Sequence, residues 1–212
     1  MGTDSMPGWV SKNFIKPIHT SMVLGKRIQR LSQGFIQLMP NKPMAGLDVG
    51  CGSGELAMSI KADRPNIQLT GVDVYVREST AIDVIGFDGS HLPFADKNFD
   101  FVMISDVLHH ANHPAALLQE CKRVAREYIF IKDHICDSAW DRQVLTFMDW
   151  VGNKGYGVVL PYNYLSSKDW KDIYKQTGLV LEEKLDKLGI YPQPFSLAFD
   201  RSLHFISRLS VV

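Results

Sequence analysis

The sequence predicts an α/β fold, a mostly parallel sheet with helices on both faces. Short apolar segments of strand length alternate with segments of helical spacing up to about residue 135. These strand-like segments are apolar almost throughout, which is typical of parallel strands covered on both sides. A glycine-rich stretch, GLDVGCGSGE at residues 46–55, joins the first such strand to a helix, and Asp73 follows its last glycine after 19 residues.

The individual elements follow from spacing and from residues that start or stop a helix. Leu24, Ile28, Leu31 and Phe35 recur at helical spacing and predict a helix over residues 20–38, which ends before two prolines. Pro114 opens a later helix, as proline favours the first helical position. Strands are expected at residues 45–49, 67–74, 82–87, 99–105 and 128–132, with a helix at 53–62.

The last third breaks this alternation. Residues 138–152 have helical spacing, and a loop rich in Gly and Tyr follows. Ser166 and Asp169 have the form of a capping box, and Gly178 is a stop signal for the helix between them. Two final strands, 179–185 and 202–209, are expected to pair antiparallel at the sheet edge. We predict a single domain over residues 1–212: an N-terminal helix (20–40), a cofactor-binding core (45–135), a cap and helix (137–176) and edge strands (178–210).

Composition excludes several classes of protein. The 212 residues are 45% hydrophobic and 22% charged, with zero net charge, so no basic footprint for nucleic acid is present. No apolar run approaches the roughly 20 residues that span a bilayer, and the start lacks the form of a secretory signal. Three cysteines without CxxC spacing predict neither a disulfide framework nor a metal site. We therefore expect a cytoplasmic protein without a membrane span.

The glycine loop predicts a ligand site at the carboxyl ends of the strands. Glycines allow close approach to the backbone, and free N–H groups at the start of the next helix can receive a polar group. Asp73 is placed to accept hydrogen bonds from two ribose hydroxyls. Glu55 stands where a dinucleotide fingerprint needs its third glycine, which disfavours NAD. Asp48 and Glu55 suit a ligand that carries positive charge, and a plain turn between a strand and a helix is the alternative.

Two further motifs carry a resemblance. Together with the loop and Asp73, FDGSHLPFADKNFD (residues 87–100) and ISDVLHH (residues 104–110) resemble class I S-adenosylmethionine-dependent methyltransferases. The resemblance is closest to the small-molecule branch with the type 11 methyltransferase domain. It implies a Rossmann-like, seven-stranded sheet with its last strand antiparallel. It also implies S-adenosyl-L-methionine as cofactor, S-adenosyl-L-homocysteine as product and a small molecule as methyl acceptor.

The resemblance also implies a role for particular residues. The methionine part of the cofactor would be held by Asp48, Gly50, Cys51, Gly52 and Gly54. The ribose and adenine would be bound by Asp73, Val74, Asp88 and Gly89, and the methyl-donor end would be lined by Ser105 and Asp106. Only about eight residues separate Asp73 from the third strand, so the helix that usually intervenes is expected to be short or missing.

Several of these residues also have a purely structural interpretation. Asp88 is equally a turn residue before Gly89, and Cys51 is equally a small residue in a tight loop. Asp106 is equally the cap of the next helix.

The catalytic prediction centres on histidines that follow the fourth and fifth strands. His134 is the candidate general base, because a histidine titrates near neutral pH, and Asp133 or Asp106 would orient it. His110 or His109 is the runner-up, and a structural role is the alternative for each histidine. Residues 137–165, rich in Trp and Tyr, would form a cap over the donor methyl group with the helix at 20–38.

Three functions remain open at this point. The first is methyl transfer to a small, partly apolar or aromatic molecule. The second is a cofactor-binding or regulatory protein without catalysis. The third is a nicotinamide oxidoreductase, which Glu55 disfavours. No oligomeric state follows from the sequence.

Overall fold

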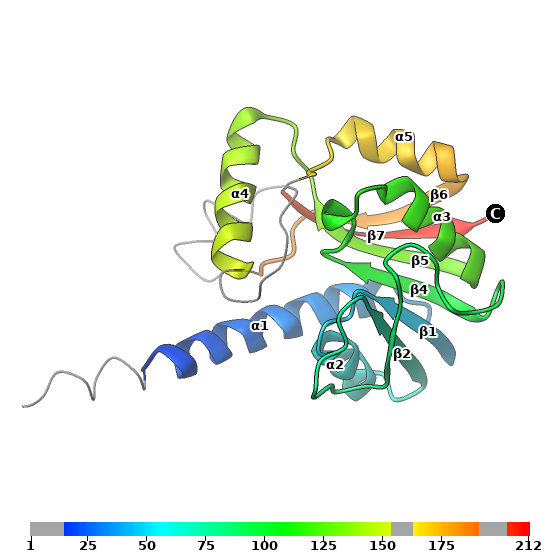
Figure 1. The fold of residues 1–212 in the computed structure, drawn as a ribbon, viewed down its shortest axis with the longest axis horizontal. Helices are drawn as coiled ribbons and strands as arrows, with labels where there is room; N and C mark the ends of the chain where they lie inside the picture. The colour runs from blue at the N-terminus through cyan, green and yellow to red at the C-terminus, as the bar shows by residue number, and fades with distance from the viewer. Residues whose placement is uncertain (1–14, 154–162, 191–202) are drawn as a thin grey trace, which may run out of the picture.

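The structure, a computed structural model, describes residues 15–153, 163–190 and 203–212 (Figure 1). It contains one seven-stranded sheet in the order β3-β2-β1-β4-β5-β7-β6. The strands are β1 (Met44–Val49), β2 (Ile67–Asp73), β3 (Val84–Gly86), β4 (Phe99–Ser105), β5 (Ala125–His134), β6 (Leu179–Leu185) and β7 (His204–Val211). The helices are α1 (Ile15–Leu38), α2 (Glu55–Asp63), α3 (Pro114–Val124), α4 (Ala139–Asn153) and α5 (Ser167–Thr177), with a short 3-10 turn at Leu108–His110.

The expected α/β sheet is confirmed, including its antiparallel last strand. The neighbouring strands from β3 to β5 pair in parallel, and β7 pairs antiparallel with both β5 and β6. The order reverses at β1, so the carboxyl ends of β1 and β4 diverge at the point where open α/β sheets bind ligands.

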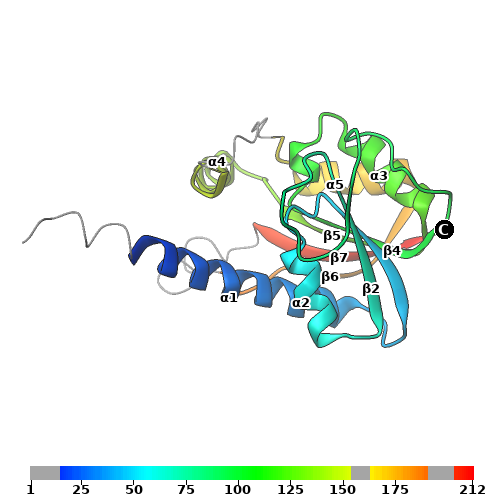
Figure 2. The ribbon, with the colours of Figure 1, turned by 60° about the horizontal axis from the view of Figure 1, so that its bottom comes forward.

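Helices cover both faces of the sheet (Figure 2). On one face α1 and α2 pack over a core that includes Phe35, Phe101 and Phe130. On the other face α3 and α5 pack against the sheet, in a core that includes Leu118 of α3 and Ile129 of β5. Fully buried aromatic and aliphatic side chains on both sides account for the near-continuous apolar strands in the sequence.

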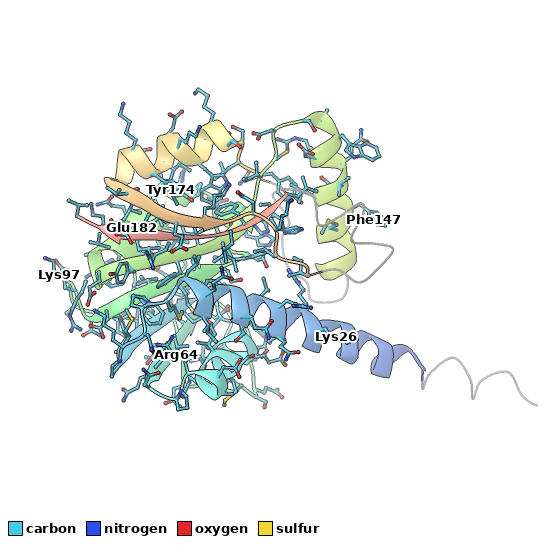
Figure 3. The ribbon with its side chains drawn as sticks, turned by 180° about the vertical axis from the view of Figure 1, so that it is seen from behind. Lys26, Arg64, Lys97, Phe147, Tyr174 and Glu182 are labelled. Atoms are coloured by element: carbon cyan, nitrogen blue, oxygen red, sulfur yellow. The ribbon has the colours of Figure 1, made fainter. Side chains whose placement is uncertain are left out.

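The packing of α5 shows how one element joins the sheet. Tyr174 lies between α5 and the sheet (Figure 3), and its hydroxyl is 3.4 Å from Ser207 Oγ on β7. The expected capping box is present: the Asp169 N–H donates to Ser166 Oγ, and the Ser166 N–H donates to Asp169 Oδ2. Gly178 ends the helix with a φ of 63°.

Several boundaries differ from the sequence prediction, and three of them bear on the site. Helix α2 begins at Glu55 instead of residue 53, because Gly54 takes a left-handed conformation as its N-cap. Helix α1 begins at Ile15, five residues before its predicted start. Strand β5 extends to His134, because Asp133 and His134 pair with Phe205 and His204 of β7. These two residues therefore end the strand, whereas the sequence analysis placed them after it.

Two kinds of helix are absent from the described residues: one between β2 and β3, and one that could span a membrane. Residues 74–83, between β2 and β3, carry no helix, as expected from their small number. Every helix in the described ranges is too short or too polar to cross a bilayer.

Candidate active site

The glycine loop between β1 and α2 has the backbone that the sequence predicted. Gly50, Gly52 and Gly54 have φ angles of 72°, 59° and 76°. A Cβ atom at Gly50 would lie 2.3 Å from Val107, so glycine is required there by packing as well as by φ. A Cβ atom at Gly52 would meet only the Arg77 guanidinium, at 3.4 Å. The loop is therefore closely packed at Gly50, whereas at Gly52 it faces the end of the Arg77 side chain.

Asp73, the last residue of β2, is tied to this loop. Its Oδ2 accepts a hydrogen bond of 2.7 Å from the Gly52 N–H, and its Oδ1 accepts one of 3.0 Å from the Tyr75 N–H. A carboxylate oxygen has two acceptor positions, so each oxygen of Asp73 keeps one for a ligand. Two acceptor positions on one carboxylate suit a pair of vicinal hydroxyls.

Asp48 lies in β1 directly below the loop and is 2% exposed. Burial, together with the negative charge of Asp73, raises the pKa of Asp48 to about 7. Near neutral pH this carboxyl is thus half protonated. A cationic group brought next to it would favour its ionised form.

The residues expected to bind adenine, Val74, Asp88 and Gly89, lie in segments without a helix. Val74 is 65% exposed, and a Cβ atom at Gly89 would lie 3.2 Å from its Cγ1, so the two residues are adjacent. Asp88 Oδ1 accepts hydrogen bonds of 2.7 Å from the N–H groups of Ser90 and His91. These bonds lower the pKa of Asp88 and make it a turn residue with its second oxygen still available.

The donor end lies at the end of β4. Asp106 follows Ser105 and has a φ of 57°, an uncommon conformation for a residue with a side chain. Its Oδ1 is bonded to the ammonium of Lys132, and its Oδ2 accepts a hydrogen bond of 3.0 Å from Arg27 Nη2 on α1. Burial alone would raise the pKa of Asp106, but these two cations hold it well below its usual value. Asp106 is thus an anion shared between β5 and α1.

His134 lies beside Asp106 at the end of β5. Its Nδ1 is 3.1 Å from Asp133 Oδ1, and its Nε2 is 3.7 Å from Asp106 Oδ1. Burial and the charge of Lys132 lower the pKa of His134 against the opposing effect of Asp133. The imidazole is therefore neutral at pH 7. Of the three catalytic residues expected from the sequence, the structure brings His134 and Asp106 together.

His109, which the sequence analysis named with His110 as the second candidate base, lies next to Asp133. Its Nδ1 is 2.7 Å from Asp133 Oδ1, and its side chain is 2% exposed. Asp133 Oδ1 also accepts a hydrogen bond of 2.8 Å from the His134 N–H. The ring of His110 lies against that of His109, with ring centroids 4.0 Å apart and an interplanar angle of 46°. The Asp133 carboxylate thus organises His109 and His134.

A divalent cation is a poor match for this cluster. Ligand atoms of Asp106, His109, Asp133 and His134 lie within 4.8 Å of one another. However, both oxygens of Asp106 already face cations, Lys132 and Arg27, and Asp133 Oδ1 accepts three N–H donors. The ammonium of Lys132 and the guanidinium of Arg27, which both face Asp106, would repel a dication placed beside it.

Comparison with known proteins agrees with this geometry. Residues 47–128 match a family model described as a methyltransferase domain. The chain contains a class I methyltransferase domain. The matched residues run from within β1 to the start of β5 and include the glycine loop, Asp73 and Asp106, whereas Lys132, Asp133 and His134 lie beyond them.

Curated relatives of the methyltransferase domain are only partly covered. An uncharacterized protein of Methanocaldococcus jannaschii is 37% identical over 86 residues, which are 38% of this chain and 39% of that protein. A demethylmenaquinone methyltransferase of Thermotoga maritima is 26% identical over 106 residues, 46% of this chain and 44% of that protein. A ubiquinone/menaquinone biosynthesis C-methyltransferase of Cupriavidus pinatubonensis is 26% identical over 140 residues, 57% of each chain. The chain thus spans from about two fifths to less than three fifths of these relatives.

Solved structures match over nearly the whole chain. A putative methyltransferase of Haloferax volcanii, solved in complex with the Trm112 methyltransferase activator, superposes with a TM-score of 0.68 at 13% identity and covers 91% of this chain and 93% of that one. A possible histamine N-methyltransferase of Thermotoga maritima superposes with a TM-score of 0.61 at 18% identity, over 93% and 96%. At such identities these structures establish the fold.

The segments that are predicted to form a cap include α4 and part of α1. Helix α4 and the first half of α1 stand beyond the same end of the sheet in both views (Figures 1 and 2). On α4, Trp140 and Phe147 are 62% and 56% exposed, and Leu145 packs with Tyr164 and Leu203. The remainder of the cap, residues 154–162, lies outside the described residues.

Two charged residues of the donor end were missed by the sequence analysis. Lys132 is fully buried although it ends the apolar run YIFIK, and Arg27 lies at helical spacing from Leu31 on the apolar side of α1. A lysine inside a buried strand, or an arginine in an apolar helical stripe, implies a partner because an unpaired buried charge is costly. That signal identifies both residues in the sequence, although it does not identify Asp106 as their partner.

Proposed function

We propose that this chain transfers the methyl group of S-adenosylmethionine to a small, partly apolar or aromatic molecule and releases S-adenosylhomocysteine. The observation that carries the proposal is the position of His134, whose Nδ1 is 3.1 Å from Asp133 Oδ1 and whose Nε2 is 3.7 Å from Asp106 Oδ1 at the end of β4. The methyltransferase domain supports it, as do relatives named as quinone-pathway methyltransferases. We also propose a cytoplasmic location and no nucleic-acid substrate, in keeping with the zero net charge.

The residues present fit the cofactor. Among the described residues the only group near Gly52 is the guanidinium of the long Arg77 side chain, and Asp73 keeps an acceptor position on each oxygen for ribose hydroxyls. Asp48 is a buried carboxyl that would be satisfied by the positive charge of the methionine part. We assign the methionine part to Asp48 and the loop of Gly50, Cys51, Gly52 and Gly54. We assign the adenosine part to Asp73, Val74, Asp88 and Gly89, and the donor end to Ser105.

The chemistry requires alignment and removal of one proton. When bound, S-adenosylmethionine supplies a methyl group on a sulfur that leaves with the C–S electron pair. His134 Nε2 accepts the proton of the acceptor hydroxyl as the new O–CH₃ bond forms. Asp133 holds the Nδ1–H and stabilises the imidazolium that results. Lys132 and Arg27 keep Asp106 ionised, so that the proton goes to the histidine instead of to this carboxylate.

The experiment measures S-adenosylhomocysteine production over a library of small hydroxylated metabolites. With an accepted substrate, His134→Ala should lower turnover by roughly 10²–10⁴-fold, the usual contribution of a general base. Affinity for S-adenosylhomocysteine, measured by calorimetry, should stay unchanged. The deficit should shrink as pH rises, because the acceptor then ionises without help.

His113→Ala is the matched control, because His113 is an exposed histidine of the same domain. Full activity of His134→Ala would remove the base and leave alignment as the mechanism. Cofactor binding without turnover over the whole library would instead support a binding or regulatory protein.

A further inference from the structure

We propose that Arg27 of α1 binds a carboxylate of the methyl acceptor, so that the acceptors are small apolar or aromatic molecules that carry a carboxylate. The inference rests on the proposed methyl transfer and specifies its substrate class. It comes from the hydrogen bonds, the exposure and the charges around Arg27.

The guanidinium of Arg27 uses few of its donors. A guanidinium has five N–H donors in a planar fork. In the described structure Nη2 donates to Asp106 Oδ2 at 3.0 Å, while Nε is buried without a hydrogen-bond partner. A buried donor that stays unsatisfied is costly, so such a group calls for a ligand or a water. The planar fork matches the two oxygens of a carboxylate better than a single acceptor.

Exposure separates Arg27 from the other cation of the donor end. Lys132 is fully buried, whereas the side chain of Arg27 is 36% exposed. The side chain of Asp106, to which both are bonded, is 25% exposed. A molecule approaching the donor end therefore meets Arg27 and Asp106 first. Lys132 pairs with Asp106 from the buried side.

Among the described residues, the charges around Asp106 leave one positive charge without a full partner. Asp106 is a single anion between two cations, with one oxygen on each. Within the described residues, the hydrogen bonds and ion pairs of Asp133 are made with His109 and His134, and none is made with Arg27. An acceptor carboxylate would complete the balance at Arg27 and leave Asp106 paired with Lys132.

The experiment uses the full chain saturated with S-adenosylhomocysteine and matched pairs of probes. The pairs are benzoate with benzamide, 4-hydroxybenzoate with 4-hydroxybenzamide, and cinnamate with cinnamamide. Each pair has nearly the same shape and differs in charge. We expect the wild-type protein to bind the acid of at least one pair tenfold or more tighter than the amide, as measured by calorimetry or by the rise in melting temperature.

Three variants isolate the role of Arg27. Arg27→Gln should abolish the preference for acid over amide, and Arg27→Lys should keep part of it, because the charge remains and the planar fork is lost. Arg30→Gln, an exposed arginine one turn further along α1, should bind like the wild type. All three should keep their affinity for S-adenosylhomocysteine.

The outcomes distinguish this inference from the proposed function. A protein that binds S-adenosylhomocysteine but shows no acid preference in any pair, or keeps its preference in Arg27→Gln, overturns the carboxylate site alone. In that case Arg27 serves only to attach α1 to β4, and Arg27→Gln would lower the melting temperature equally with and without probes. Failure to bind S-adenosylhomocysteine overturns the proposed function itself.

Discussion

At the residue scale, Asp73 connects the ligand site to its own loop. Its carboxylate already holds the N–H groups of Gly52 and Tyr75, so removal of the side chain affects both the loop and the ribose hydroxyls. Asp73→Ala should weaken S-adenosylhomocysteine binding by a few kcal/mol, since hydrogen bonds to charged groups contribute about 1.5–3 kcal/mol each. Calorimetry measures the loss, with Asp63→Ala, an exposed acid at the end of α2, as control. Unchanged affinity in a folded Asp73→Ala protein would remove Asp73 from the site.

Gly52 allows the effect of backbone strain to be separated from that of lost space. Its φ of 59° disfavours any side chain, and left-handed backbone costs roughly 1–2 kcal/mol per residue. Gly52→Ala should carry mainly this cost, whereas Gly52→Val should also fill the space beside the loop. We expect Gly52→Val to lose cofactor binding while its melting temperature falls little below that of Gly52→Ala. Normal binding by both variants would mean that the loop is only a turn.

Asp48 should make stability depend on pH. Its pKa is about 7 in the folded chain instead of the usual 3.8, because burial and then Asp73 disfavour the charged form. A raised pKa contributes stability that is fully present below about pH 4 and is lost as pH rises through about 7. Asp48→Asn, which cannot ionise, should therefore gain stability over the wild type between pH 4 and pH 8, by on the order of 4 kcal/mol at most. Urea denaturation at several pH values measures this gain, and a difference independent of pH would contradict it.

At the element scale, the capping box connects one short motif to the stability of α5. Ser166 Oγ accepts the Asp169 N–H, which would otherwise have no partner in the first turn of the helix. Ser166→Ala should lower the free energy of unfolding by about 1 kcal/mol, within the range of 0.5–2 for lost N-caps. Urea denaturation measures the change, and Ser166→Asp, which retains an acceptor oxygen, should recover most of it. An unchanged midpoint in Ser166→Ala would show that packing of Trp170 and Tyr174 alone holds the helix.

At the scale of the whole molecule, the cofactor should raise the melting temperature. A ligand at 100 times its dissociation constant stabilises a folded chain by about 2.7 kcal/mol. S-adenosylhomocysteine should therefore shift unfolding upward, and NAD at the same concentration should not, because Glu55 replaces the glycine of a dinucleotide fingerprint. An equal shift by NAD would restore the oxidoreductase alternative.

The sequence by itself determined the alternation of elements, the glycine loop and the carboxylate at the end of β2. Each of these depends on local information. Apolar runs and helical spacing record which faces are buried, and positive φ selects glycine at Gly50, Gly52 and Gly54. Strand β4 was predicted with its observed bounds, Phe99–Ser105, because a mostly apolar run of strand length marks it in the sequence.

Only the tertiary structure decided which charged groups meet. Arg27 and Asp106 are 79 residues apart in sequence, and Lys132 and Asp106 are 26 apart. Their pairing depends on where α1 crosses the end of β4 and on the parallel pairing of β4 with β5, which local periodicity does not encode. The choice of His109 over His110 beside Asp133 was likewise undecided, because adjacent residues in a 3-10 turn point in different directions. The sequence specifies which side chains are present. The electrostatic environment that gives each group its role arises from contacts between distant segments.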